Sequence, residues 1–128
     1  MLLNNMHVLT LLISLVIVQP LLEYWIHRVV HVLDLEFHID HHRHYSRVAY
    51  WRYRGNSCVW VISIVLGLIG WYTAALMVLR YEIVHIAAHR VPSLRPLHRH
   101  HFAHHRNHNV NFGVSAIWPD RLFRTIEP

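Results

Sequence analysis

Hydrophobic positions along this chain gather in two long runs, and polar segments rich in histidine follow each of them. The first run extends from Met1 to Leu22 and the second from Ser57 to Leu79, and neither contains a formally charged residue. A helix needs roughly 20 apolar residues to cross a bilayer, so both runs are long enough to do so. We therefore expect an all-α fold whose apolar helices enter a membrane.

The first run predicts a retained transmembrane helix over residues 1–26. It lacks the basic start of a secretory signal, and no small-residue cleavage site precedes Glu23-Tyr24-Trp25. Arginine first appears at Arg28 and recurs in the segments after both runs. Because positively charged flanks stay in the cytoplasm, we expect the histidine-rich segments on the cytoplasmic side and the N-terminus on the other.

The second run is too short for two full crossings, although histidine and arginine lie on both sides of it. Only 25 uncharged positions separate Arg54 from Arg80, whereas two crossings need about 40 residues. A shallow hairpin that turns at residues 67–70 would keep both flanks on one side of the membrane. The alternative is a single span, which would separate the histidines unless two chains associate.

Length and composition predict one domain over residues 1–128. We divide it into a transmembrane helix (1–26), a first histidine cluster (27–47), an apolar hairpin with a third histidine box (48–90), and a fourth box with the C-terminal tail (91–128). The chain has 12 arginines, no lysine and a single cysteine, Cys58, which excludes an intrachain disulfide. Since the arginines lie beside long apolar runs, we expect a membrane surface and no nucleic acid as partner.

Fifteen of the 128 residues are histidine, and ten of them form a spaced pattern that occurs twice. The pattern is H-x-x-x-H followed by H-x-x-H-H, and its members are His27, His31, His38, His41 and His42, then His85, His89, His101, His104 and His105. Residues three or four apart share one face of a helix, so each motif can aim its imidazoles at one point. Ten neutral nitrogen ligands suffice for two transition-metal ions. Few thiolates or carboxylates share these spacings, which argues against calcium, magnesium or an iron–sulfur cluster.

Other polar residues near the motifs each allow two interpretations. The histidines outside the pattern are His7, His44, His98, His100 and His108. We expect His7 at the membrane interface, and His98 or His100 could compete with His101 as a ligand. The carboxylates that could accept a hydrogen bond from a ligating imidazole, or instead neutralise arginine, are Glu23, Glu36, Asp40 and Glu82. Asn111 could orient a ligand from outside the metal shell, or serve as a turn residue before Gly113.

These motifs resemble the fatty acid hydroxylase/sterol desaturase superfamily of membrane histidine-box enzymes, which includes the small carotene hydroxylases. The segments similar to its four boxes are residues 23–31, 38–42, 82–89 and 101–105, with Asn111-Phe112-Gly113 after the fourth. The resemblance covers about residues 20–126. The family usually has two fuller hairpins, whereas this chain has one N-terminal span and a compressed second unit.

The tail also resembles the family, whose sequence ends in W-D-R-x-F-G-T. Residues 118–125 follow that ending with two departures, since Pro119 stands where the family usually has Trp and Arg124 where it has Gly. Neither position is a predicted metal ligand. The two departures affect the expected geometry of the local turn. The shorter length affects the expected substrate cavity and not the metal site.

The resemblance implies an oxidoreductase with two iron ions held by the ten pattern histidines, zinc being a substitute in a purified sample. It further implies dioxygen as co-substrate, a separate electron-donor protein, and a membrane lipid whose C–H bond is oxidised. Hydroxylation is the favoured reaction and desaturation the alternative on the same site. A non-catalytic membrane metal-binding or transport protein stays open, although a transporter would place ionisable residues at mid-membrane depth. The membrane would be a bacterial inner membrane or of endoplasmic-reticulum type, and the sequence leaves the lipid and the oligomeric state undetermined.

Overall fold

Helices make up all regular structure in the described part of the chain. The computed structural model describes residues 2–44, 54–94 and 96–127. Its elements are α1 (Leu2–Ile13), the π-helical turn η1 (Ser14–Val18), α2 (Gln19–Val32), α3 (Glu36–His44), α4 (Arg54–Leu68), α5 (Tyr72–Arg90), the 3-10 turn η3 (Pro92–Leu94), α6 (Arg99–Arg106) and α7 (Trp118–Leu122). The predicted all-α class is confirmed.

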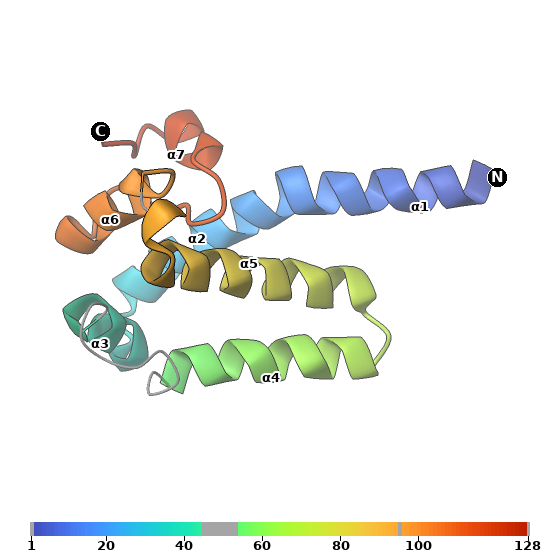
Figure 1. Cartoon of the computed structure of the whole chain (residues 1–128), viewed down its shortest axis with the longest axis horizontal. Coiled ribbons are helices and arrows are strands. Elements are labelled where there is room, and N and C mark those ends of the chain that lie inside the picture. Colours follow the sequence, from blue (N-terminus) through green and yellow to red (C-terminus); the bar gives the residue numbers. More distant parts are fainter. Residues whose placement is uncertain (1, 45–53, 95, 128) are drawn as a thin grey trace.

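The segments α1, η1 and α2 form one continuous helix that leaves the rest of the molecule at its N-terminal end (Figure 1). Its stretch Asn5–Val32 contains an 18-residue window with a mean hydropathy of 1.8 and is, among the described residues, the one helix long and apolar enough to cross a membrane. The helix ends at Val32, six residues after the end of the predicted transmembrane span of residues 1–26. The first histidine box therefore lies on the same helix as the apolar run.

The π-helical turn gives this helix a polar contact within its apolar stretch. The backbone N–H of Gln19 donates to the Ser14 carbonyl, five residues earlier. Pro20 has no N–H to offer the next carbonyl, that of Leu15. Arg80 of α5 supplies the missing donor at 3.2 Å, and it also donates to Gln19 Oε1 at 2.8 Å. Arg80 thus joins α5 to the long helix.

A tight reversal after α2 folds α3 back towards it. Asp34 takes a left-handed conformation with φ 48°. The N–H groups of Asp34 and Leu35 donate to the carbonyls of His31 and Val30 at 3.2 and 3.4 Å, which is the Schellman pattern of helix C-termini. Because the connection is this short, α3 lies beside the end of α2.

The second apolar run forms an antiparallel hairpin of α4 and α5, with its turn where we expected it. Gly70 has φ +85° and donates to the Gly67 carbonyl at 3.1 Å, and Ser63 Oγ donates across the hairpin to the Ala75 carbonyl at 3.0 Å. At 1.5 Å per residue, the 15 residues of α4 span about 22 Å. That is less than the roughly 30 Å of a hydrocarbon core, so the hairpin is short for a full crossing.

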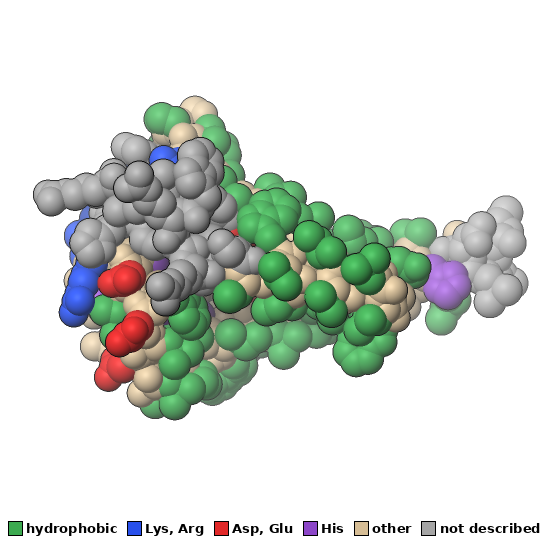
Figure 2. Space-filling view, turned by 90° about the horizontal axis from the view of Figure 1, so that it is seen from below, with side chains coloured by type: hydrophobic (Ala, Val, Ile, Leu, Met, Phe, Trp, Pro, Cys, Tyr) green, Lys and Arg blue, Asp and Glu red, His purple; other side chains and the backbone are tan. Residues whose placement is uncertain are grey.

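The long helix and the hairpin extend in the same direction from a cap built by α3, α6 and α7 (Figure 1). The N-terminus and the hairpin turn lie away from the cap, and the C-terminus lies at it. Apolar side chains cover the surface of the extended part (Figure 2), as expected for helices that face lipid. The chain returns at the hairpin turn, so both histidine-rich regions lie at the cap end.

Candidate metal centre

The ten pattern histidines meet at the cap in two groups of five. Cluster A contains His27, His31, His38, His42 and His104, and cluster B contains His41, His85, His89, His101 and His105. Within each cluster, one ligand atom from every histidine lies within 4.8 Å of all the others. Each group could therefore hold a metal ion, and no residue outside the predicted set belongs to either group among the described residues.

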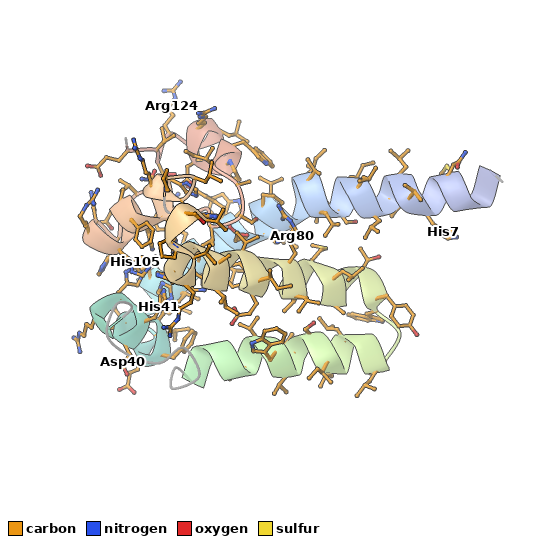
Figure 3. The ribbon with its side chains drawn as sticks, in the orientation of Figure 1. His7, Asp40, His41, Arg80, His105 and Arg124 are labelled. Atoms are coloured by element: carbon orange, nitrogen blue, oxygen red, sulfur yellow. The ribbon has the colours of Figure 1, made fainter. Side chains whose placement is uncertain are left out.

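Each cluster draws on three helices, and α3 and α6 contribute to both. Cluster A takes two histidines from α2, two from α3 and one from α6, while cluster B takes one from α3 and two each from α5 and α6. The neighbours His41 and His42 face different clusters because successive residues of a helix point about 100° apart. Figure 3 shows His41 close to His105, which lies on α6.

The close nitrogen contacts in cluster A are more numerous than hydrogen bonds among these rings can explain. His38 Nε2 lies 3.0 Å from His27 Nε2, 2.9 Å from His31 Nε2 and 3.0 Å from His42 Nε2. A neutral imidazole carries one N–H, so it cannot donate to three nitrogens at once. The lone pairs of these rings thus converge on a shared point.

Cluster B has the same arrangement around His89. Its Nε2 lies 3.2 Å from His85 Nε2, 2.9 Å from His101 Nε2 and 3.2 Å from His105 Nε2. His41 closes the group through His85, with 3.1 Å between their Nε2 atoms. The two clusters thus offer two nitrogen-only ligand sets of equal size.

These distances fit a metal ion with five or six ligands better than a tetrahedral one. With metal–nitrogen bonds of about 2.1 Å, neighbouring ligands stand about 3.0 Å apart in an octahedron and about 3.4 Å apart in a tetrahedron. The neighbouring nitrogens here are 2.9–3.2 Å apart. Structural zinc sites are tetrahedral and closed, so the donor set is not of that kind.

The cluster imidazoles in the cap are held in the neutral form that binds metals. Burial, together with repulsion from other imidazoles, lowers the pKa of His104 to about 2. Burial likewise lowers the pKa of His42 and of His101 well below its usual range, again with repulsion from neighbouring rings. Protons therefore compete weakly with a metal ion for these nitrogens at neutral pH.

Backbone carbonyls fix the ring orientation of two cluster A histidines. His27 Nδ1 lies 2.6 Å from the Phe112 carbonyl, and His104 Nδ1 lies 2.7 Å from the Val110 carbonyl. A carbonyl only accepts, so both Nδ1 atoms carry the proton and both Nε2 atoms present lone pairs to the cluster. The segment 110–112 therefore orients ligands from α2 and α6. The sequence analysis missed this role, because a backbone carbonyl is present in every residue type.

Asn111 lies between these two carbonyls, but its side chain does not contact an imidazole. The residue is fully buried with φ 54°, and its amide pairs with the backbone of Glu127 at 2.8 and 2.9 Å. Its N–H donates to the Thr125 carbonyl at 2.8 Å. Any influence of Asn111 on the ligands therefore passes through the loop backbone, and its predicted role beside the centre stays a prediction.

Two buried carboxylates hold the loop that carries these carbonyls. Asp120 accepts from the N–H groups of Phe112 and Gly113, each at 2.8 Å. Glu23 accepts from the N–H groups of Val114 and Ser115. A Cβ on Gly113 would lie 2.2 Å from the Ala116 carbonyl oxygen, so no larger residue fits there. Glu23 supports the centre through this loop, not by the direct bond to an imidazole that we considered.

The other carboxylates near the motifs do not contact the ligands either. Glu36 and Asp40 are exposed, and neither oxygen of the buried Glu82 has a hydrogen-bond partner in the part of the chain that the structure describes. None of these residues shows the bond to a ligating imidazole that we considered for them.

The histidines outside the pattern whose side chains the structure describes lie outside both clusters. His98 and His100 are not members of cluster A or B, whereas their neighbour His101 is. His7 lies far along the N-terminal helix (Figure 3). The side chain of His44 lies outside the described residues. His101 thus lies in cluster B while its neighbours do not, and its role as a ligand stays a prediction.

Comparison with known protein families matches residues 12–125 to the fatty acid hydroxylase family. The chain belongs to this family. The matched segment includes all ten cluster histidines and the loop that orients them. This match confirms the resemblance found in the sequence. Fatty acid hydroxylases are membrane-associated and generally oxidoreductases. No curated protein and no solved structure gives a significant match.

Both departures from the family ending fit the local structure of this chain. Pro119 occupies the first turn of α7, where a missing N–H leaves no bond unmade. Arg124 has φ 57°, the left-handed conformation that Gly adopts most easily. Arg124 therefore takes a backbone conformation that a glycine would adopt at a lower steric cost.

Proposed function

We propose that this member of the fatty acid hydroxylase family is an oxygen-dependent lipid hydroxylase with one iron ion in each cluster. The observation that carries the proposal is the division of ten imidazoles into two groups of five convergent nitrogens. Imidazole suits iron as well as zinc and copper. The nitrogen spacing and the redox character of the family favour iron, and zinc would be a substitute in a purified sample.

The proposed reaction converts a C–H bond of a membrane lipid into C–OH. One atom of dioxygen enters the lipid and the other leaves as water, with two electrons and two protons supplied through a separate donor protein. Bound iron would supply the one-electron chemistry that dioxygen activation requires. The lipid, the donor protein and the ten ligands are parts of this proposal.

The residues of the chain would position the ligands and exclude water. Glu23 and Asp120 hold the loop whose carbonyls orient His27 and His104. Neutral imidazoles leave the charge of a bound cation uncompensated, which favours anionic oxygen ligands. The apolar helices next to the cap would place a lipid chain beside the clusters. The excess of arginine in the segments after the two apolar runs supports a cytoplasmic location of the cap.

Lipid analysis of membranes that contain the protein tests this function. Cells expressing the wild type, His41→Ala or the control His98→Ala would grow under dioxygen labelled with a heavy oxygen isotope. We expect a lipid with one heavy oxygen atom in the wild type and the control, and none in His41→Ala. A new double bond without the label would show a desaturase instead. Identical lipids in all three cultures would favour a metal-binding protein without catalysis.

A further inference from the structure

An eleventh imidazole, that of His108, lies against cluster A without belonging to it. Its ring centroid is 4.2 Å from that of His42 and 5.4 Å from that of His31. Ring pairs inside the cluster have similar separations, such as 4.4 Å for His31 and His38 and 5.1 Å for His27 and His31. His108 is therefore spaced from two ligands as the ligands are spaced from one another.

His108 is exposed, whereas the cluster histidines are buried or half-buried. It follows α6 in a loop that Asn107 shapes, since Asn107 Oδ1 accepts from the Asn109 N–H at 3.3 Å and its amide donates to Glu127 Oε2 at 2.9 Å. His31, which His108 stacks on, is only half-buried. His108 and His31 thus mark an edge of cluster A that faces solvent.

One exposed carboxylate, that of Asp34, lies at this edge of a chain that is basic as a whole. The formal net charge is +5, yet three of the seven acidic residues, Asp34, Glu36 and Asp40, lie within seven positions and are exposed. Asp34 lies close enough to His31 for a direct electrostatic interaction. Figure 2 shows acidic side chains at the end of the molecule opposite the N-terminus. A carboxylate beside His31 attracts an incoming cation at short range.

We propose that His108, His31 and His42 form an uptake site that captures a divalent transition-metal ion from solution and passes it into cluster A. An exposed imidazole is the first nitrogen that an incoming ion meets, and His31 and His42 already belong to the final ligand set. Ligands could then exchange one at a time without exposing the buried rings. His108 would leave the ion afterwards, because five other nitrogens converge in the cluster. This inference rests on the proposal that cluster A binds a metal ion.

Loading of the metal-free protein in detergent with Co²⁺, followed by stopped-flow absorbance, tests the uptake site. His108→Ala removes the ring, whereas His108→Phe keeps a ring against His31 and His42 but removes its nitrogens. We expect both variants to slow loading at least about tenfold, within the range by which local steering alters association rates. The final content of two ions per chain and the circular dichroism should stay unchanged. The control His98→Ala should load at the wild-type rate.

The charge contribution is tested by Asp34→Asn, because Asn tolerates the left-handed backbone at this position. We expect slower loading at low ionic strength and a wild-type rate at high salt, where exposed charges are screened. A direct contact is tested with His108→Cys in a Cys58→Ser background. A thiolate-to-cobalt absorption band should appear early in loading and then decay.

The outcomes separate this inference from the proposed function. If His108→Phe loads at the wild-type rate, or the cysteine variant never shows the transient band, the ring only packs against the cluster and the uptake site is wrong. If the wild type does not bind two ions at all, the two-metal centre fails first and the uptake site fails with it. Slow loading in both His108 variants with a full final metal content supports the site.

Discussion

Arg124 is the residue whose backbone departs most clearly from what its side chain favours. Its φ of 57° places it in the left-handed region, at the position where the fatty acid hydroxylase ending usually has Gly. The neighbouring backbone bond from the Thr125 N–H to the Asp120 carbonyl, at 2.9 Å, holds the turn in place. The fold therefore keeps this conformation despite the wrong residue type.

Replacing Arg124 by Gly should stabilise the protein by about 1 kcal/mol, because left-handed backbone costs a non-glycine residue about that much. Thermal unfolding in detergent, monitored by circular dichroism, measures the change. The matched control is Arg121→Gly, three residues earlier in α7. There a glycine should destabilise by up to about 1 kcal/mol, since it loosens a helix. A lower unfolding temperature for Arg124→Gly would show that the arginine side chain has a compensating contact.

At the scale of the elements, the spacing of the histidines predicted which helix faces meet. It did not predict which imidazoles belong to cluster A and which to cluster B. The repeated H-x-x-x-H and H-x-x-H-H motifs identify ten histidines that share helix faces. His41 and His42 nevertheless face different clusters, which depends on where α3 lies relative to α2 and α5. The carbonyls of Val110 and Phe112 were equally invisible in the sequence, because every residue has a carbonyl and only the fold selects two of them.

The contact between α5 and the long helix depends on Arg80. Its replacement by Met should destabilise the protein by about 2–3 kcal/mol, because the Leu15 carbonyl and Gln19 Oε1 would lose a charged donor in apolar surroundings. Chemical unfolding in detergent gives the value. Pro20→Ala should reduce this loss in the double variant, since alanine provides a backbone N–H within the same turn. If the two losses simply add, the missing N–H does not explain the contact.

At the scale of the whole molecule, both histidine-rich regions lie at one end of an elongated helical structure. The length of the first uncharged run predicted the N-terminal helix. The hairpin turn was predicted because the second run is too short for two crossings and has histidine and arginine on both sides. The helix extends to Val32, beyond the predicted transmembrane span of residues 1–26, whose bounds stay a prediction. The side of the membrane that the cap faces stays a prediction from the arginine distribution.

Burial of so many imidazoles makes the metal-free protein sensitive to acid. The pKa of His42, His101 and His104 is lowered in the folded protein, whereas an unfolded chain protonates histidine near pH 6.5. The unfolded state thus binds more protons, so stability is complete above about pH 6.5 and falls as the pH decreases, by up to about 1.4 kcal/mol per unit for each such histidine. Unfolding midpoints at several pH values between 7.5 and 5 measure this loss. A metal-loaded sample should resist it, and a midpoint independent of pH would contradict the buried neutral ligands.

Counting iron in the anaerobically reconstituted protein tests the two-cluster centre most directly. The wild type and the control His98→Ala should each bind two ions per chain. The double variant His27→Ala/His104→Ala removes two ligands of cluster A, and His85→Ala/His101→Ala removes two of cluster B. Each double variant should keep one ion and its helical signal. A wild type that saturates at one ion per chain would contradict the account.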